Sequence, residues 1–154
     1  MIKTLEHIIT YLREVLSRAK FGASARTEER IFPSNCLVVD DSASFAEQIS
    51  LQLEQLGISS DEVGSSGDAI RKTQAEAGKY QLYAIDYNLP GLDGVDLAKE
   101  LIESHGVHPK QILIFSGSVL PPKSSEILSK MNTLGFLQKP IHSKELLYKI
   151  AATS

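Results

Sequence analysis

The sequence predicts an α/β protein in which a doubly wound parallel sheet is built from five βα units. Bare apolar tetrads at 36–39, 82–85 and 112–115 have the composition of strands that are covered on both faces. Amphipathic segments follow, near 44–56, 67–77, 93–104, 121–132 and 143–152. Because strand and helix alternate at this rhythm, right-handed crossovers and a parallel sheet are the default.

Two further strands complete the predicted sheet. The segment GFLQ at 135–138 is a short fourth apolar run. The segment ISSDEV at 58–63 lies where a strand is needed but is half polar. An edge strand tolerates that composition, since one side of it meets water. We therefore expect 58–63 at an edge of the sheet.

Residues that favour helix starts precede several of the amphipathic segments. Ser44 and Glu47 have the spacing of a capping box, and Asp93 is a candidate cap. Pro121 and Pro122 are suited to the first turn of the fourth helix, because proline fixes a helical φ and needs no amide partner there. Ser143 is a candidate cap for the last helix.

Bulk composition indicates an ordinary globular protein. The chain has 154 residues, about one domain, with 42% hydrophobic and 23% charged residues. Its single cysteine, Cys36, cannot form an internal disulfide, which fits a reducing compartment, and its apolar neighbours predict a small buried hydrophobe. A net charge of -3 without a dense basic run argues against a nucleic-acid partner. With no membrane-length apolar stretch and no signal-peptide pattern, we expect no membrane insertion and a cytoplasmic location.

The N-terminal segment differs in pattern from the rest. Residues 1–20 carry apolar residues at steps of three and four, which predicts one amphipathic helix, and polar residues 21–34 are typical of a linker. A helix of under three heptads is marginal alone, so it needs a surface on its own domain or on a second chain. The remaining range, 35–154, is the predicted α/β domain.

Polar side chains follow four of the predicted strands. The first strand ends in Asp40 and Asp41, the third in Asp86, the fourth in Ser116, and the fifth in Lys139. Ligands of such sheets bind beyond the carboxyl ends of the strands, where strand order reverses. Each residue alone is compatible with a helix cap, a turn or a surface charge. Together they predict one site.

Three neighbouring carboxylates repel one another unless a cation or proton intervenes. Mg²⁺ suits the set, because it takes hard oxygen ligands and keeps positions open for water and phosphate oxygens. This arrangement suggests phosphoryl chemistry. Asp86 would be the nucleophile, Asp41 would hold Mg²⁺, and Asp40 would orient its water shell. Lys139 would neutralise the incoming phosphoryl group, and Ser116 would hydrogen-bond one of its oxygens.

The motifs VVDDS, IDYNLPGLDG, IFSG and GFLQKP, in this order, resemble the receiver domain of two-component response regulators, including the single-domain chemotaxis type. The resemblance covers about residues 35–152. It implies a flavodoxin-like (βα)5 fold with strand order 2-1-3-4-5. It also implies that Asp86 is phosphorylated, that Asp40 and Asp41 are the acidic metal pair, and that the backbone carbonyl of Asn88 completes the Mg²⁺ shell.

The same resemblance implies a switch. Ser116 takes the position that contacts the phosphoryl group, Gly117 leaves room for its entry, and Lys139 is the lysine of the pattern. Phe136 falls at the switch aromatic, where a buried aromatic beside the fifth strand is the structural alternative. The affected surface would be 121–152. No enzyme activity is implied beyond self-phosphorylation and self-dephosphorylation.

The implied partners are a sensor histidine kinase or phosphotransfer protein and a downstream protein that the sequence does not name. The chain ends at Ser154, directly after the fifth predicted helix, so we expect no DNA-binding output domain. Two alternatives remain: a phosphorelay intermediate, or an assembly module whose N-terminal helix mediates homodimerisation. A haloacid-dehalogenase-like phosphatase is disfavoured, because Ser42 stands where that class has a second aspartate.

Overall fold

The computed structural model describes residues 33–151 and contains one parallel five-stranded sheet. The strand order is β2-β1-β3-β4-β5, which confirms the predicted topology. The strands are β1 (Asn35–Val39), β2 (Ser59–Val63), β3 (Leu82–Asp86), β4 (Ile112–Ser116) and β5 (Phe136–Gln138). The predicted N-terminal helix at 1–20, and nearly all of the predicted linker at 21–34, lie outside the described residues.

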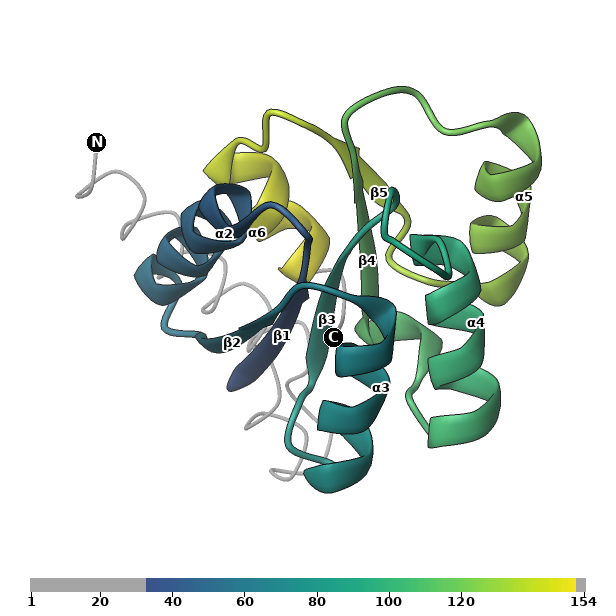
Figure 1. Ribbon diagram of the computed structural model, residues 1–154. Helices are drawn as coiled ribbons and strands as arrows, with labels where there is room; N and C mark the ends of the chain where they lie inside the picture. Colours follow the sequence, from purple (N-terminus) through teal and green to yellow (C-terminus); the bar gives the residue numbers. More distant parts are fainter. Residues whose placement is uncertain (1–32, 152–154) are drawn as a thin grey trace, which may run out of the picture.

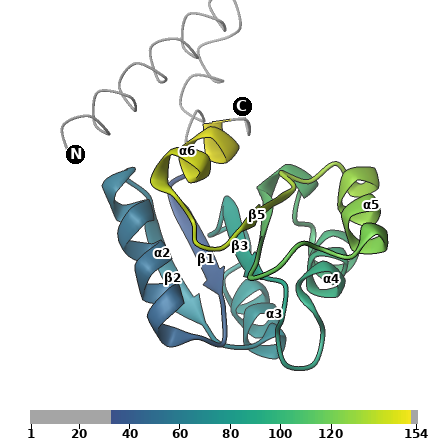
Figure 2. The same ribbon diagram turned by 90° about the horizontal axis from the view of Figure 1, so that it is seen from above.

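Helices cover both faces of the sheet (Figures 1 and 2). On one face lie α2 (Ala43–Gln55) and α6 (Ser143–Ala151). On the other lie α3 (Ser66–Ala75), α4 (Gly94–His105) and α5 (Pro122–Met131), and a short 3-10 turn, η2 (Pro109–Gln111), precedes β4. None of these helices of residues 33–151 is long and apolar enough to cross a membrane.

The core is divided by the sheet into two apolar clusters. Residues of β1, β3 and β4 alternate between them, since successive strand side chains point to opposite faces. Cys36 is fully buried in the cluster under α2 and α6, as its apolar neighbours predict. Because both faces of these central strands are covered, their sequences are continuous apolar runs and not alternating ones.

The half-polar strand β2 lies at an edge of the sheet, as predicted. It pairs with β1 in parallel register, from Asn35 opposite Ser59 to Val39 opposite Val63. Each of its residues is at least partly exposed, which explains why the strand tolerates Asp61 and Glu62.

The first helix of the domain has a different cap from the predicted one. Ser42, not Ser44, is the N-cap of α2, and its hydroxyl accepts from the Phe45 amide at 3.4 Å. The cause is Asp40, whose Oδ1 accepts from the Ser42 amide at 2.8 Å and turns the chain directly out of β1. The predicted Asp93 cap of α4 is confirmed, with its carboxylate accepting from the Asp96 amide at 2.8 Å.

Helix α5 is less embedded than its neighbour α4. Leu128 is the single fully buried residue among the ten of α5, whereas five residues of α4 are buried. Pro122 is its first residue, as predicted, and its N-cap, Pro121, provides no side-chain hydrogen bond to the helix. With one buried residue and no capping side chain, α5 is less strongly anchored than α4.

Candidate functional site

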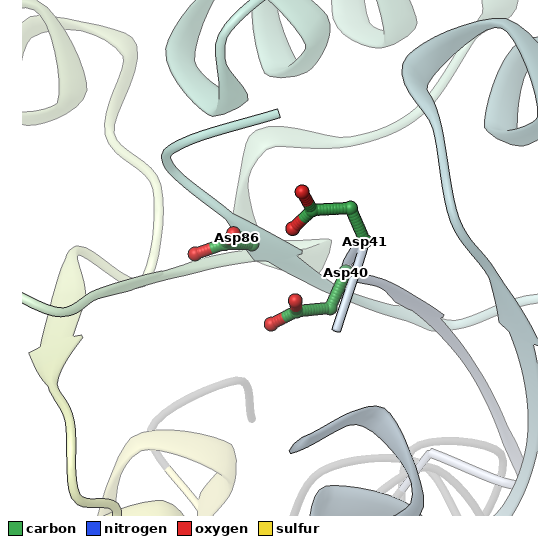
Figure 3. A group of neighbouring side chains, drawn as sticks. All are labelled: Asp40, Asp41 and Asp86. Atoms are coloured by element: carbon green, nitrogen blue, oxygen red, sulfur yellow. The ribbon is translucent and has the colours of Figure 1, made fainter. Parts of the chain in front are cut away.

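The strand ends bring three carboxylates together at one edge of the sheet (Figure 3). Asp40 and Asp41 follow β1, Asp86 ends β3, and one oxygen of each lies within 4.8 Å of the others. Asp40 and Asp86 are 3% and 4% exposed, whereas Asp41 is exposed. The predicted convergence of these carboxylates is observed, and Asp40 and Asp86 are buried.

Lys139 joins two of the carboxylates. Its Nζ donates to Asp40 Oδ2 at 3.0 Å and lies 3.2 Å from Asp86 Oδ1. The Lys139 side chain is 22% exposed, so the ion pairs are largely screened from solvent. The lysine backbone is fixed as well, because its amide donates to the Ser116 carbonyl at 2.7 Å. A single ammonium is thus held at the side chain of the candidate nucleophile.

The charges of the site are not balanced by that ammonium. Burial, followed by repulsion from Asp40, raises the pKa of Asp86, and the attraction of Lys139 opposes this rise. A carboxyl group that is buried beside another negative charge favours its neutral form, because the charged form loses hydration and is repelled. A bound cation would favour the ionised form.

The donor set fits a hard divalent cation such as Mg²⁺. It consists of carboxylate oxygens, and exposed Asp41 leaves the site open on one side for water or phosphate oxygens. Asn88 lies in the turn two residues after Asp86, with its side chain exposed. The contribution of its backbone carbonyl to a metal shell remains a prediction.

The hydroxyl of Ser116 is engaged within its own loop. Ser116 is fully buried, its Oγ donates to the Ser118 carbonyl at 2.6 Å, and it accepts from the Ser118 amide at 3.3 Å. Phe136 is half-buried and packs against the core cluster under α3, α4 and α5. Ser116 ends β4, the neighbour of β3 in the sheet, and Phe136 begins the edge strand β5.

Gly94 is a residue of the site that sequence reasoning missed. A Cβ added there would lie 2.5 Å from the Asp86 carbonyl oxygen and 2.9 Å from Tyr87 Cα. The Gly94 amide also donates to the Tyr87 carbonyl at 2.8 Å. Helix α4 thus begins against the backbone of the candidate nucleophile. The glycine after the Asp93 cap is the signal that could have indicated this close approach.

Two aromatic side chains beside the site were also missed. The Lys139 ammonium lies 3.8 Å from the centroid of the Phe45 ring. The Tyr87 hydroxyl lies 3.0 Å from that of Ser124 in the first turn of α5. No local pattern predicts either contact, since each joins segments that are distant in the sequence.

Comparison with known proteins agrees with this geometry. The family model of the response regulator receiver domain matches residues 36–151. A two-component response regulator of Arabidopsis thaliana is 27% identical over 82% of this chain. A cyclic di-GMP phosphodiesterase response regulator of Xanthomonas campestris pv. campestris is 27% identical over 88% of it. The chain spans only 20% and 37% of these two relatives.

Two solved structures are similar to this chain over nearly their whole length. A CheY-like receiver domain from Methylobacillus flagellatus is 27% identical with a TM-score of 0.66, and the match covers 79% of this chain and 98% of that one. A response regulator from Chloroflexus aurantiacus has a TM-score of 0.68 at 23% identity, covering 79% of this chain and 97% of that one. The second likeness concerns the fold alone.

Proposed function

Because the chain belongs to the response regulator receiver domain family, we propose that it accepts a phosphoryl group on Asp86. The observation that carries the proposal is the position of this carboxylate. Asp86 ends a strand whose five residues are all buried, and it lies beside Lys139, Asp40 and Asp41. A histidine kinase, or a phosphotransfer protein supplied by one, is the donor that membership of a two-component family implies.

The proposed step is a displacement at phosphorus. An Asp86 carboxylate oxygen attacks the phosphorus of a phosphohistidine, a new O–P bond forms, and the P–N bond breaks. The electron pair of that bond stays on the leaving imidazole nitrogen. Lys139, whose Nζ lies 3.2 Å from Asp86 Oδ1, would pair with an oxygen of the incoming group.

A divalent cation is part of the proposal. We assign Asp40, Asp41, Asp86 and the Asn88 carbonyl as the groups that would hold Mg²⁺. When bound, Mg²⁺ neutralises charge on the phosphoryl oxygens. The raised pKa of Asp86 fits the assignment, since burial first and then repulsion from Asp40 outweigh the attraction of Lys139.

Ser116 and Phe136 are proposed to report phosphorylation to the surface 121–152. For Ser116 to donate to a phosphoryl oxygen, its hydroxyl must leave the Ser118 carbonyl, which frees the loop that leads into α5. Shifting two states from 1:99 to 99:1 takes about 5.5 kcal/mol. Hydrogen bonds to a charged group contribute roughly 1.5–3 kcal/mol each, so Ser116 and Lys139 could supply much of it. A downstream protein would recognise the changed surface.

The test is phosphorylation by acetyl phosphate with Mg²⁺, with the modified residue located by mass spectrometry. Asp86→Asn should abolish incorporation, because an amide is a poor nucleophile. Asp96→Asn is the matched control, since Asp96 is an exposed carboxylate on α4, and it should label like the wild type. Undiminished labelling of Asp86→Asn would place the acceptor elsewhere.

A further inference from the structure

Phe45 forms part of the surroundings of Lys139. It lies in the first turn of α2, and the centroid of its half-buried ring is 3.8 Å from Lys139 Nζ. The ring also makes an edge contact with Phe115, at a centroid distance of 6.0 Å and an interplanar angle of 76°. Phe115 is 1% exposed. The Phe45 ring is therefore supported by the core and contacts the ammonium at the same time.

The ammonium has three identifiable neighbours. It donates to Asp40, pairs with Asp86, and meets the Phe45 ring. The ring attracts a cation through the negative charge of its π face and excludes water from that side. A lysine has a flexible four-carbon stem and a strongly hydrated head, so its position depends on such contacts.

We propose that Phe45 is a positioning residue, whose ring face holds the Lys139 ammonium against Asp86 and thereby raises the rate of phosphorylation. The inference rests on the proposed function, because it assigns Lys139 a role at the phosphoryl group. The Phe45 ring contacts Lys139 and Phe115. It acts through the lysine, and its effect depends on the π face of the ring.

A core-packing role alone makes a different prediction. Packing against Phe115 and the core needs apolar volume, which leucine also provides. Attraction to the ammonium needs an aromatic face, which tyrosine keeps and leucine lacks. Phe45→Leu and Phe45→Tyr therefore separate the two roles. Leu51→Ala is the control, because Leu51 is a 54% exposed apolar residue on the same helix as Phe45 and lies outside the surface 121–152.

The first measurement is the NMR spectrum of Lys139. A ring this close should shift the protons of the Lys139 ε-methylene upfield, and loss of the resonance in Lys139→Gln identifies it. We expect the upfield shift in the wild type and in Phe45→Tyr, and its disappearance in Phe45→Leu. An unshifted resonance in the wild type would overturn the proposal. This measurement needs no phosphoryl donor.

The second measurement is the rate of Asp86 phosphorylation by acetyl phosphate at saturating Mg²⁺. We expect Phe45→Leu to lower it about fivefold, which is about 1 kcal/mol at 1.4 kcal/mol per factor of ten. Phe45→Tyr and Leu51→Ala should keep the wild-type rate. An unchanged rate in folded Phe45→Leu, judged by circular dichroism, would refute the role of the ring. If Phe45→Leu does not fold, Phe45→Met takes its place with the same expected outcomes.

The two proposals fail in distinguishable ways. Equal labelling of wild type and Asp86→Asn would defeat the proposed function, while the lysine resonance would still report whether the ring holds the ammonium. Labelling confined to Asp86, with equal rates for leucine and tyrosine at position 45, would defeat the inference about Phe45 alone.

Discussion

The Tyr87 hydroxyl lies 3.0 Å from the Ser124 hydroxyl, so the residue directly after Asp86 is tied to the first turn of α5. The backbone of Tyr87 is hydrogen-bonded on both sides of its Cα. Its amide donates to the Phe115 carbonyl at 2.7 Å, and its carbonyl accepts from Gly94 at 2.8 Å. A rigid backbone thus presents a hydroxyl to a helix that has a single fully buried residue.

Tyr87→Phe should lower the free energy of unfolding by about 0.5–1.5 kcal/mol, the usual net value of one hydrogen bond. Urea denaturation measures the change. Tyr148→Phe is the control, because that tyrosine is 57% exposed, and it should be neutral. If the hydroxyls act as a pair, Ser124→Ala combined with Tyr87→Phe costs less than the sum of the two single changes. Strict additivity would contradict the pairing.

Gly94→Ala should destabilise the domain by about 1–3 kcal/mol, as overpacking does, because the new Cβ would lie 2.5 Å from the Asp86 carbonyl oxygen. Thermal unfolding measures the change. Gly67→Ala is the matched control in the first turn of α3. There the nearest atoms, at 3.5 Å or more, belong to the flexible Arg71 side chain. This control should be neutral or stabilising, since alanine favours helix over glycine by about 1 kcal/mol. Equal effects at the two sites would refute the close approach at Gly94.

Asp86→Asn should stabilise the metal-free protein at neutral pH. Burial and Asp40 raise the pKa of Asp86, so the folded protein keeps this proton to higher pH than the unfolded chain does. The free energy of unfolding therefore falls as pH rises from the ordinary aspartate pKa, about 3.9, to the raised pKa of the folded protein. Above the raised pKa the loss of stability reaches its full value.

The measurement is thermal unfolding in EDTA across that pH range. The excess Tm of Asp86→Asn should grow as pH rises and should vanish below the ordinary aspartate pKa. In a chain of this size roughly 2–4 °C corresponds to 1 kcal/mol. Asp96→Asn, which removes an exposed charge, is the control. A stability gain for Asp86→Asn that is largest at acidic pH would contradict a raised pKa of Asp86 in the folded protein.

Asp41→Ala should weaken Mg²⁺ binding in isothermal titration calorimetry. Even outer-shell partners of a metal contribute about 10–100-fold in affinity, so the loss of a ligand carboxylate should cost at least tenfold. Because Asp41 is exposed, the variant should fold normally, which separates metal affinity from stability. Unchanged affinity would remove Asp41 from the proposed ligand set.

Sequence alone predicted the parts of the fold that depend on local pattern. The tetrads at 36–39, 82–85 and 112–115 are strands because both faces of the central sheet are buried. The convergence of Asp40, Asp41 and Asp86 followed from topology, since parallel strands end at one edge. The predicted N-cap of α2, Ser44, was wrong. Ser42 and Ser44 both have capping side chains, and the hydrogen bond from the Ser42 amide to the Asp40 carboxylate favours the helix start at Ser42.

The contacts that sequence could not predict are those between distant segments. Phe45 is an ordinary apolar residue in its helix, and its position beside Lys139 depends on how α2 packs on the sheet. The bond from Tyr87 to Ser124 likewise depends on where α5 lies. Both contacts depend on the positions of side chains in three dimensions, which neither the hydrophobic periodicity nor a sequence motif specifies.

The unequal packing of β3 and α5 has a consequence for hydrogen exchange. All five residues of β3 are buried, and the strand is paired on both sides, whereas one residue of α5 is fully buried. Amides of β3 should then exchange only through global unfolding, and those of α5 through local opening at much lower free energy. A phosphoryl charge on Asp86 would therefore act on a strand that rarely unfolds locally. Its effect on hydrogen exchange should appear as changed amide protection along α5.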